Sequence, residues 1–124
     1  MLLAVYMSFR FEKLTIWQDA RELVSTVYKI TKSFPADERF GLTNQIRRAA
    51  VSIALNIAEG SDKKSDPEFR RFLRMAIGSC EELITGFYIS LDQNYIAKED
   101  FDIIYKQTNE LVIKINALIK SLKL

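Results

Sequence analysis

Basic side chains in the middle of the chain carry the clearest chemical signal in the sequence. Residues 39–74 hold 8 Lys and Arg against 4 Asp and Glu, although the whole chain has a net charge of only +2. Charge gathered in one segment attracts phosphate even when the total is small, and arginine donates two parallel hydrogen bonds to phosphate oxygens. This pattern predicts contact with nucleic acid. The predicted phosphate-binding residues are Arg47, Arg48, Lys63, Lys64, Arg70, Arg71 and Arg74.

The same basic side chains have a structural interpretation as well. They could form ion pairs with Glu59, Glu81 and Glu82, within one chain or between copies, and then only solvate the surface. If they do bind phosphate, we expect little sequence preference, because Phe69 and Phe72 are assigned to the core and leave no exposed ring for base stacking in this segment. The first interpretation favours an RNA- or DNA-binding protein, and the second favours a protein–protein interaction scaffold.

A line of polar side chains lies along one side of segment 40–59, at helical spacings of four and three residues. Such side chains are neighbours on a helix and can form a hydrogen-bonded ladder. The turn 70–74 of the next helix is expected beside residues 52–56, with Arg48 further along the same seam. A Glu59 that caps the following turn or pairs with Arg70 explains the line without a binding site. We therefore expect a structural role for Ser52, Asn56 and Glu59, which continue the line from Arg48.

Enzyme chemistry is poorly supported by the residue types. The chain has no histidine, which excludes Glu-x-x-His di-iron pairs, a Ser-His-Asp triad and histidine-ligated zinc. Residues 60–64 contain one glycine and lack the spacing of a phosphate-binding loop. The best enzymatic alternative is an arginine clamp on an anionic substrate assisted by a glutamate, as in helical chorismate mutases, but the arginines are expected on outer faces. We expect no catalytic residue, no metal site and no cofactor.

Hydrophobic periodicity predicts four helices, near residues 16–33, 40–59, 67–93 and 98–122. Short links between them favour antiparallel neighbours, so the expected fold is all-α, an antiparallel up-down four-helix bundle. Asp66 is the expected N-cap of the third helix, and Gly60 is expected in a left-handed conformation at the end of the second. The predicted buried residues are Trp17, Ile53, Phe72, Phe87 and Ile115, and the predicted apolar arc of the first helix is Trp17, Ala20, Val24, Val27, Tyr28 and Thr31.

Segment 40–59 has a second apolar side that a monomeric bundle would leave in water. One arc of about 100°, which includes Ile46, Ile53 and Ile57, is wide enough to face the core. The other arc consists of small and apolar residues, which let a neighbouring helix approach closely. It predicts a subunit interface; the alternative is that another helix or the N-terminal segment of the same chain covers it. The predicted interface residues are Val51, Ala54, Leu55 and Ala58.

Three stretches together resemble a known protein family: FEKLTIWQDARELV (Phe11–Val24), LTNQIRRAAVSIALNIAEG (Leu42–Gly60) and FRRFLRMAIGS (Phe69–Ser79). They are similar to the four-helix-bundle proteins encoded in bacterial 23S rRNA intervening sequences. The resemblance implies a homo-oligomer, a pentameric ring, whose relatives serve as nucleic-acid-binding accessory proteins of diversity-generating retroelements. RNA, DNA, a reverse transcriptase or another protein are the partners that it implies. The chain departs from the family at Ala54 and Leu55, where relatives usually have proline and a small residue.

The resemblance covers residues 9–122, which indicates how the chain is organised. Residues 9–124 form the expected single domain, and residues 1–8 form an expected flexible N-terminal extension. The opening MLLAVYM has no preceding basic region and no cleavage site, so we expect no export signal. No apolar run approaches the ~20 residues of a membrane-spanning helix. The single cysteine, Cys80, suits a reducing compartment, so we expect a cytoplasmic protein with no membrane partner.

Overall fold

The structure, a computed structural model, describes residues 8–123. Within them the chain forms four long helices, two short 3-10 helices and no strand, which confirms the all-α fold. The long helices begin and end within two residues of the expected positions. The expected flexible extension 1–8 lies, apart from Ser8, outside the described residues. In chain order the elements are η1 (Arg10–Lys13), α2 (Thr15–Thr31), η2 (Ala36–Glu38), α3 (Leu42–Ser61), α4 (Asp66–Asp92) and α5 (Lys98–Ser121).

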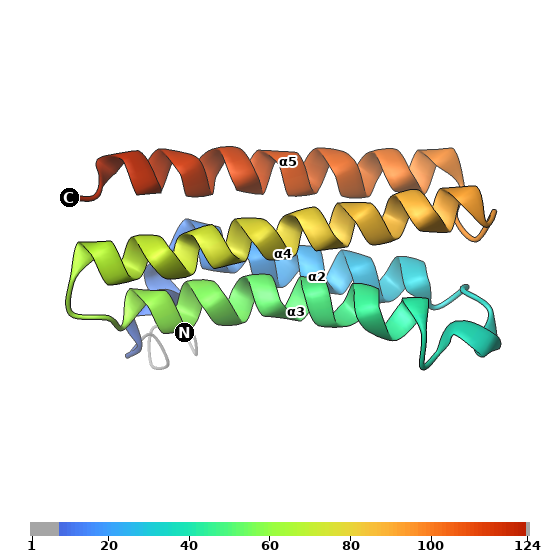
Figure 1. Ribbon diagram of the computed structural model, residues 1–124, viewed down its shortest axis with the longest axis horizontal. Coiled ribbons are helices and arrows are strands. Elements are labelled where there is room, and N and C mark those ends of the chain that lie inside the picture. The colour runs from blue at the N-terminus through green and yellow to red at the C-terminus, as the bar shows by residue number, and fades with distance from the viewer. Residues whose placement is uncertain (1–7, 124) are drawn as a thin grey trace, which may run out of the picture.

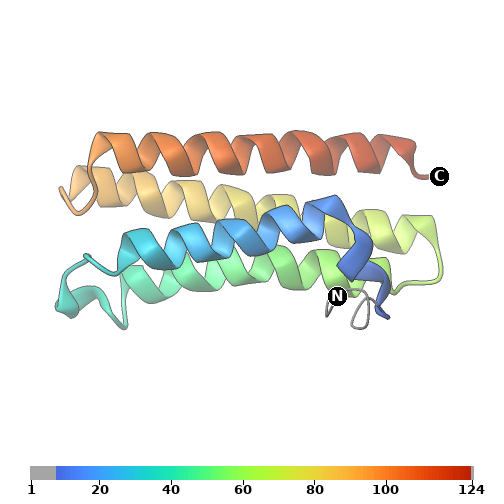
Figure 2. The same ribbon diagram turned by 180° about the vertical axis from the view of Figure 1, so that it is seen from behind.

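The four long helices run antiparallel to their neighbours and close into a ring. Each packs on the next one along the chain, and α2 also packs on α5. Contacts near both ends of α3 and α4 set their direction, since Ile46 lies opposite Gly86 and Gly60 lies opposite Phe72. Figures 1 and 2 show the resulting up-down bundle, with the α3–α4 turn at one end and the α2–α3 and α4–α5 connections at the other.

Side chains from all four long helices meet in one core along the bundle axis. The predicted core residues Ile53, Phe87 and Ile115 are completely buried, and Phe72 is also buried. Complete burial of an aliphatic or aromatic side chain of this size contributes roughly 1.5–3 kcal/mol. This cluster stabilises the bundle without a disulfide, because the one cysteine has no partner for an internal bridge.

The face of α2 that meets the core is rotated from the predicted arc. Trp17 is half-buried at the edge of the core instead of inside it, with its ring centre 4.7 Å from that of Phe11. Val24 is likewise half-buried, and Tyr28 is exposed. The prediction failed because neighbouring positions on a helix differ by only about 100° and both edges of this arc are apolar. The buried positions of α2 are Ile16, Ala20, Leu23, Val27 and Thr31.

Two helix ends differ from the prediction. Ser65, and not Asp66, is the N-cap of α4, because its side chain accepts a hydrogen bond from the backbone N–H of Glu68 at 3.3 Å. Gly60 does not have a left-handed backbone; it lies inside α3, which continues past it. A Cβ atom at Gly60 would come within 2.6 Å of the Cβ of Phe72. This glycine therefore permits the close packing of α3 on α4.

Candidate nucleic-acid interface

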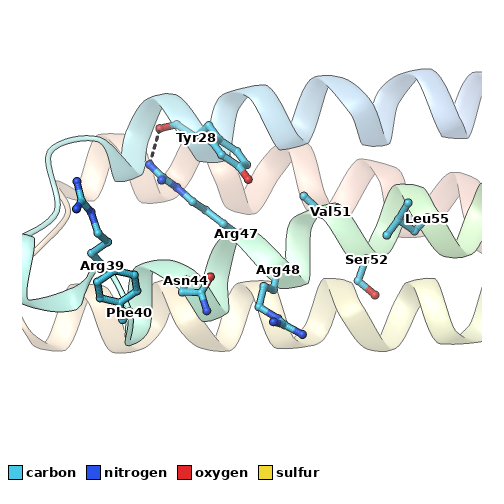
Figure 3. A pocket seen from close by; sticks show the side chains of 9 residues that line it. All are labelled: Tyr28, Arg39, Phe40, Asn44, Arg47, Arg48, Val51, Ser52 and Leu55. Carbon is cyan, nitrogen blue, oxygen red and sulfur yellow. Dashed lines mark hydrogen bonds between the residues drawn. The ribbon is translucent and has the colours of Figure 1, made fainter.

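An open groove runs along the outward side of α3, bounded by the end of α2 and the α2–α3 connection (Figure 3). Its volume of about 630 Å³ lies in the range of pockets that bind small ligands. The groove brings three arginines beside aromatic and apolar side chains, and no acidic residue lines it. We call it the arginine groove, and its residues are Tyr28, Arg39, Phe40, Asn44, Arg47, Arg48, Val51, Ser52 and Leu55.

Arg47 forms the wall of the arginine groove that joins α3 to α2. Its Nε donates a hydrogen bond of 2.9 Å to the hydroxyl of Thr31, a residue that is itself buried. Its guanidinium carbon lies 4.6 Å from the centre of the Tyr28 ring, and a terminal nitrogen donates to the Tyr28 carbonyl at 3.5 Å. These contacts hold the half-buried Arg47 in one position, pointing toward α2 (Figure 3).

Arg39 and Arg48 are the exposed cations of the arginine groove. Neither side chain makes a hydrogen bond or an ion pair with any residue between 8 and 123, unlike that of Arg47. Arg48 points from α3 toward α4, and Arg39 projects from the α2–α3 connection (Figure 3). Within this part of the chain, both guanidinium groups therefore have all their donors available for a ligand.

A smaller hollow of about 280 Å³ adjoins the arginine groove and shares Arg39 and Arg47 with it. Lys32 adds another cation there, and no acidic residue lines this hollow either. Thr43 also lines it, and its buried hydroxyl has no hydrogen-bond partner among the described residues. The positive charge therefore extends from the outward face of α3 around the end of α2.

The structure adds residues that the sequence analysis missed. Phe40, in the connection before α3, has 88% of its surface exposed, and Tyr28 has 40% exposed. An aromatic ring is therefore exposed beside the arginines, although none was expected in the basic segment. Arg39 and Asn44 were also missed. Arg39 stands alone in a connection, away from the adjacent arginines of the predicted helices, and Asn44 is uncharged. The one signal in the sequence was the Arg39–Phe40 pair. A large apolar residue in a connection, next to an arginine, indicates an exposed ring beside a cation.

The other five predicted residues lie near the opposite end of α3. Ser79 of α4 hydrogen-bonds to Ser52 of α3, so Arg74 lies more than a helical turn from Ser52, toward the α3–α4 turn. Arg48 and Ser61, the last residue of α3, are separated by about 20 Å along the helix axis at 1.5 Å per residue, and Lys63 follows Ser61 in the turn. The expectation that turn 70–74 lies beside residues 52–56 is therefore wrong, because this turn lies beside the end of α3, where Phe72 packs on Gly60. We call the second group the turn cluster: Lys63, Lys64, Arg70, Arg71 and Arg74.

Several cations of the turn cluster already have partners within the chain. Arg70 donates to the backbone carbonyl of Lys123 at 2.6 Å, and Arg71 pairs with Glu68 at 3.4 Å. Lys63 and Arg71 also lie over the ring of Phe72, at 5.0 and 4.7 Å from its centre.

The predicted pairing with Glu59, Glu81 and Glu82 does not occur within residues 8–123. In the turn cluster, Arg74 and Lys64 are exposed and make no ion pair there. These two are the cations that the turn cluster leaves for a ligand.

The polar line of α3 forms in part. Asn56 Nδ2 donates to the carbonyl oxygen of Ser52 at 2.9 Å and to its Oγ at 3.1 Å, and Ser79 Oγ donates to Ser52 Oγ at 2.9 Å. The Ser79 bond connects α4 to α3, whereas both Asn56 bonds lie within α3. Glu59 is exposed and its side chain makes no hydrogen bond or ion pair within residues 8–123, so the predicted cap or pair with Arg70 is wrong.

The second apolar arc of α3 is covered unevenly. Ala54 is half-buried and packs against the core of its own chain, and Ala58 and Val51 are half-buried. Leu55 remains 63% exposed. Ala54 is therefore covered by its own chain, which was the alternative to a subunit interface. Leu55 is the residue of this arc that is exposed to a second copy.

Other reactive groups in the described residues are few. Cys80 is buried in the core, and burial together with the nearby charge of Glu81 raises the pKa of its thiol to about 12. A buried thiol with a raised pKa is a poor nucleophile. Residues 8–123 contain no group of three or more His, Cys, Asp or Glu side chains placed to hold a metal ion. No helix in this part of the chain is both long and apolar enough to cross a membrane.

The fold and the arginine groove define an all-helical bundle protein with a cationic surface groove. Residues 12–117 match the family model described as the 23S rRNA-intervening sequence protein, and the chain belongs to this family. The resemblance seen in the three sequence stretches is thus confirmed.

A solved structure of a protein with unknown function from the S23 ribosomal protein family of Bacteroides thetaiotaomicron has a similar fold. The TM-score is 0.79 at 21% sequence identity, and the match covers 86% of this chain and 99% of that chain. At this identity the likeness shows the fold alone. A comparison with curated proteins found no match.

Proposed function

We propose that this protein is a non-catalytic, homo-oligomeric accessory protein that binds RNA or DNA through phosphate contacts in the arginine groove. The observation that supports binding is the lining of the groove, which holds three arginines and no acidic residue in a chain of net charge +2. Opposite unit charges 4 Å apart attract by about 4 kcal/mol near a protein surface, before screening by salt. The groove has no carboxylate, thiol or imidazole, so its chemistry suits binding and not bond breaking.

The turn cluster is proposed as a secondary contact. Glu68 neutralises part of the charge of Arg71, and one N–H of Arg70 already donates a hydrogen bond to the backbone carbonyl of Lys123. Lys63 lies over the ring of Phe72, whereas Arg74 and Lys64 make no ion pair, hydrogen bond or ring contact within residues 8–123. We therefore expect the first phosphates to bind at Arg39 and Arg48, and a long strand to gain further contacts at the turn cluster.

We also propose that copies associate through the outer face of α3 near Leu55, as the family resemblance implies. Leu55 lies toward the end of the arginine groove that is remote from Arg39 and Phe40 (Figure 3). Contact between copies there would leave Arg39 and Phe40, at the other end of the groove, accessible. Several grooves on one particle would bind a single strand more tightly than one groove, because each later contact is intramolecular.

Charge reversal in the groove tests the binding. Fluorescence anisotropy with labelled RNA and DNA would be measured over a series of salt concentrations for wild type and for Arg39→Glu/Arg48→Glu. Bound phosphates release counterions, so wild-type affinity should fall steeply with salt. Loss of two phosphate contacts should weaken binding and reduce the slope of log K against log salt by about 2. Arg70→Glu/Arg74→Glu should have a smaller effect.

The matched control is Lys106→Glu/Lys120→Glu, which makes the same change in net charge with two exposed residues of α5. Helix α5 has no close backbone contact with α3, so this control leaves the groove intact. If wild type binds neither RNA nor DNA at low salt, or if the control weakens binding as much as the groove variant, the proposal is overturned. A protein–protein scaffold would then be favoured, because the exposed Phe40 and Leu55 also suit a polypeptide partner such as a reverse transcriptase.

A further inference from the structure

Phe40 is the most exposed large apolar side chain in the described residues, at 88%. The segment that carries it is held in place on one side, because Glu38 accepts a hydrogen bond from the backbone N–H of Leu42 at 3.0 Å and another from the hydroxyl of Tyr95 at 2.9 Å. The ring makes no aromatic contact with residues 8–123, whereas Tyr28 is stacked by Arg47. The backbone near Phe40 is thus held in place, while its ring is open to a ligand.

The neighbours of Phe40 in the arginine groove supply hydrogen-bonding groups for the phosphate and the base of a nucleotide. Arg39 precedes it in the chain, and Arg48 lies further along the groove (Figure 3). Between them lies Asn44, whose exposed side-chain amide makes no hydrogen bond within residues 8–123 and offers both a donor and an acceptor. A stacking face, two phosphate donors and an amide that can meet a base edge therefore lie on one surface.

We infer that the arginine groove selects single-stranded over double-stranded nucleic acid by stacking an unpaired base on Phe40. This inference rests on the proposed nucleic-acid binding and states which form is bound. Both faces of a base inside a duplex are covered by its neighbours, so only a single strand, a loop or an end can present a base to the ring. Phosphate contacts alone would favour the duplex, which has the higher charge density. Preference for a single strand therefore depends on the aromatic ring.

The test compares a labelled single strand with a duplex of the same sequence and length, as RNA and as DNA. Wild type should bind the single strand more tightly. Phe40→Ala should weaken binding of the single strand by roughly 5- to 150-fold, the loss expected for one stacked base, and should change duplex binding less than about twofold. Phe40→Tyr should keep the preference. The matched control, Tyr105→Ala, removes an exposed aromatic ring from α5 and should change neither affinity.

A second readout reports the stacking itself. In Phe40→Trp, the fluorescence of the new indole should be quenched by the single strand and not by the duplex, with the signal of Trp17 subtracted using wild type. If wild type prefers the duplex, or if Phe40→Ala leaves the ratio of the two affinities unchanged, the inference is wrong while phosphate binding stands. If wild type binds neither form at low salt, the proposed function itself fails, and the inference with it.

Discussion

Two glycines of α4 show how much a single residue decides in this bundle. A Cβ atom at Gly86 would come within 2.6 Å of Cγ1 of Ile46, which is 1% exposed, whereas a Cβ at Gly78 would meet nothing within 4 Å. Gly86→Ala should therefore destabilise the protein by about 1–3 kcal/mol through overpacking. Gly78→Ala should stabilise it by roughly 0.5–1 kcal/mol, because alanine favours the helix.

Urea unfolding of both glycine variants and wild type, at one protein concentration, measures this difference. Each substitution adds the same methyl group to the same helix, so Gly78→Ala is the matched control for Gly86→Ala. Equal stability of the two variants would contradict the close approach of α3 and α4 at Ile46.

At the scale of elements, the start of α3 depends on one carboxylate. Glu38 accepts hydrogen bonds from the backbone N–H of Leu42 and from the hydroxyl of Tyr95, and these two bonds hold the pKa of Glu38 below its ordinary value of 4.5. Because the folded-state pKa is the lower one, the stabilisation is present above pH 4.5 and is lost as the pH falls through the folded-state pKa. The bond from Tyr95 also links the α4–α5 connection to the α2–α3 connection.

Glu38→Gln should therefore lower the thermal midpoint at neutral pH. Its difference from wild type should shrink as the pH falls below 4.5 and through the lowered folded-state pKa, where the wild-type carboxylate becomes protonated. Thermal unfolding followed by circular dichroism across this range checks the expectation. Glu82→Gln, at an exposed carboxylate without an ion pair in residues 8–123, should show no such trend. A constant difference between Glu38→Gln and wild type at all pH values would assign the effect to something other than this charge.

At the scale of the whole molecule, the proposed association of copies depends on the exposed part of the second apolar arc. Leu55→Arg should place a charge in the apolar contact between copies and reduce the particle mass toward the 14.4 kDa of one chain. The bundle should stay folded, because Leu55 is 63% exposed. Ala54 is less suitable for this test, since it packs against the core of its own chain.

Light scattering coupled to size exclusion measures the mass of the Leu55→Arg variant. Ile113→Arg is the matched control, because Ile113 is 60% exposed and lies on α5. This control should keep the wild-type mass. If Leu55→Arg also keeps it, the outer face of α3 is not the contact between copies.

Much of the fold could be predicted because its determinants are local. Each helix repeats apolar residues at its own period, and short links leave few arrangements other than an antiparallel bundle. Single positions were harder to predict. Trp17 and Ile16 are adjacent and both apolar, so periodicity could not decide which one faces the core. A left-handed conformation was expected for Gly60 because its contact with Phe72 is not visible in the sequence.

The candidate site also has features that the sequence predicts and features that depend on packing. The sequence by itself determined the family, the arginine pair at the start of α3 and the apolar second arc, because these are properties of one segment. Only the tertiary structure decided which cations are neighbours. Because Ser52 lies opposite Ser79, Arg74 is distant from Arg48. Because α2 packs on α3, Tyr28 lies against Arg47. The arginine groove draws on two helices and a connection, and the distance between such residues depends on packing register, which no local pattern encodes.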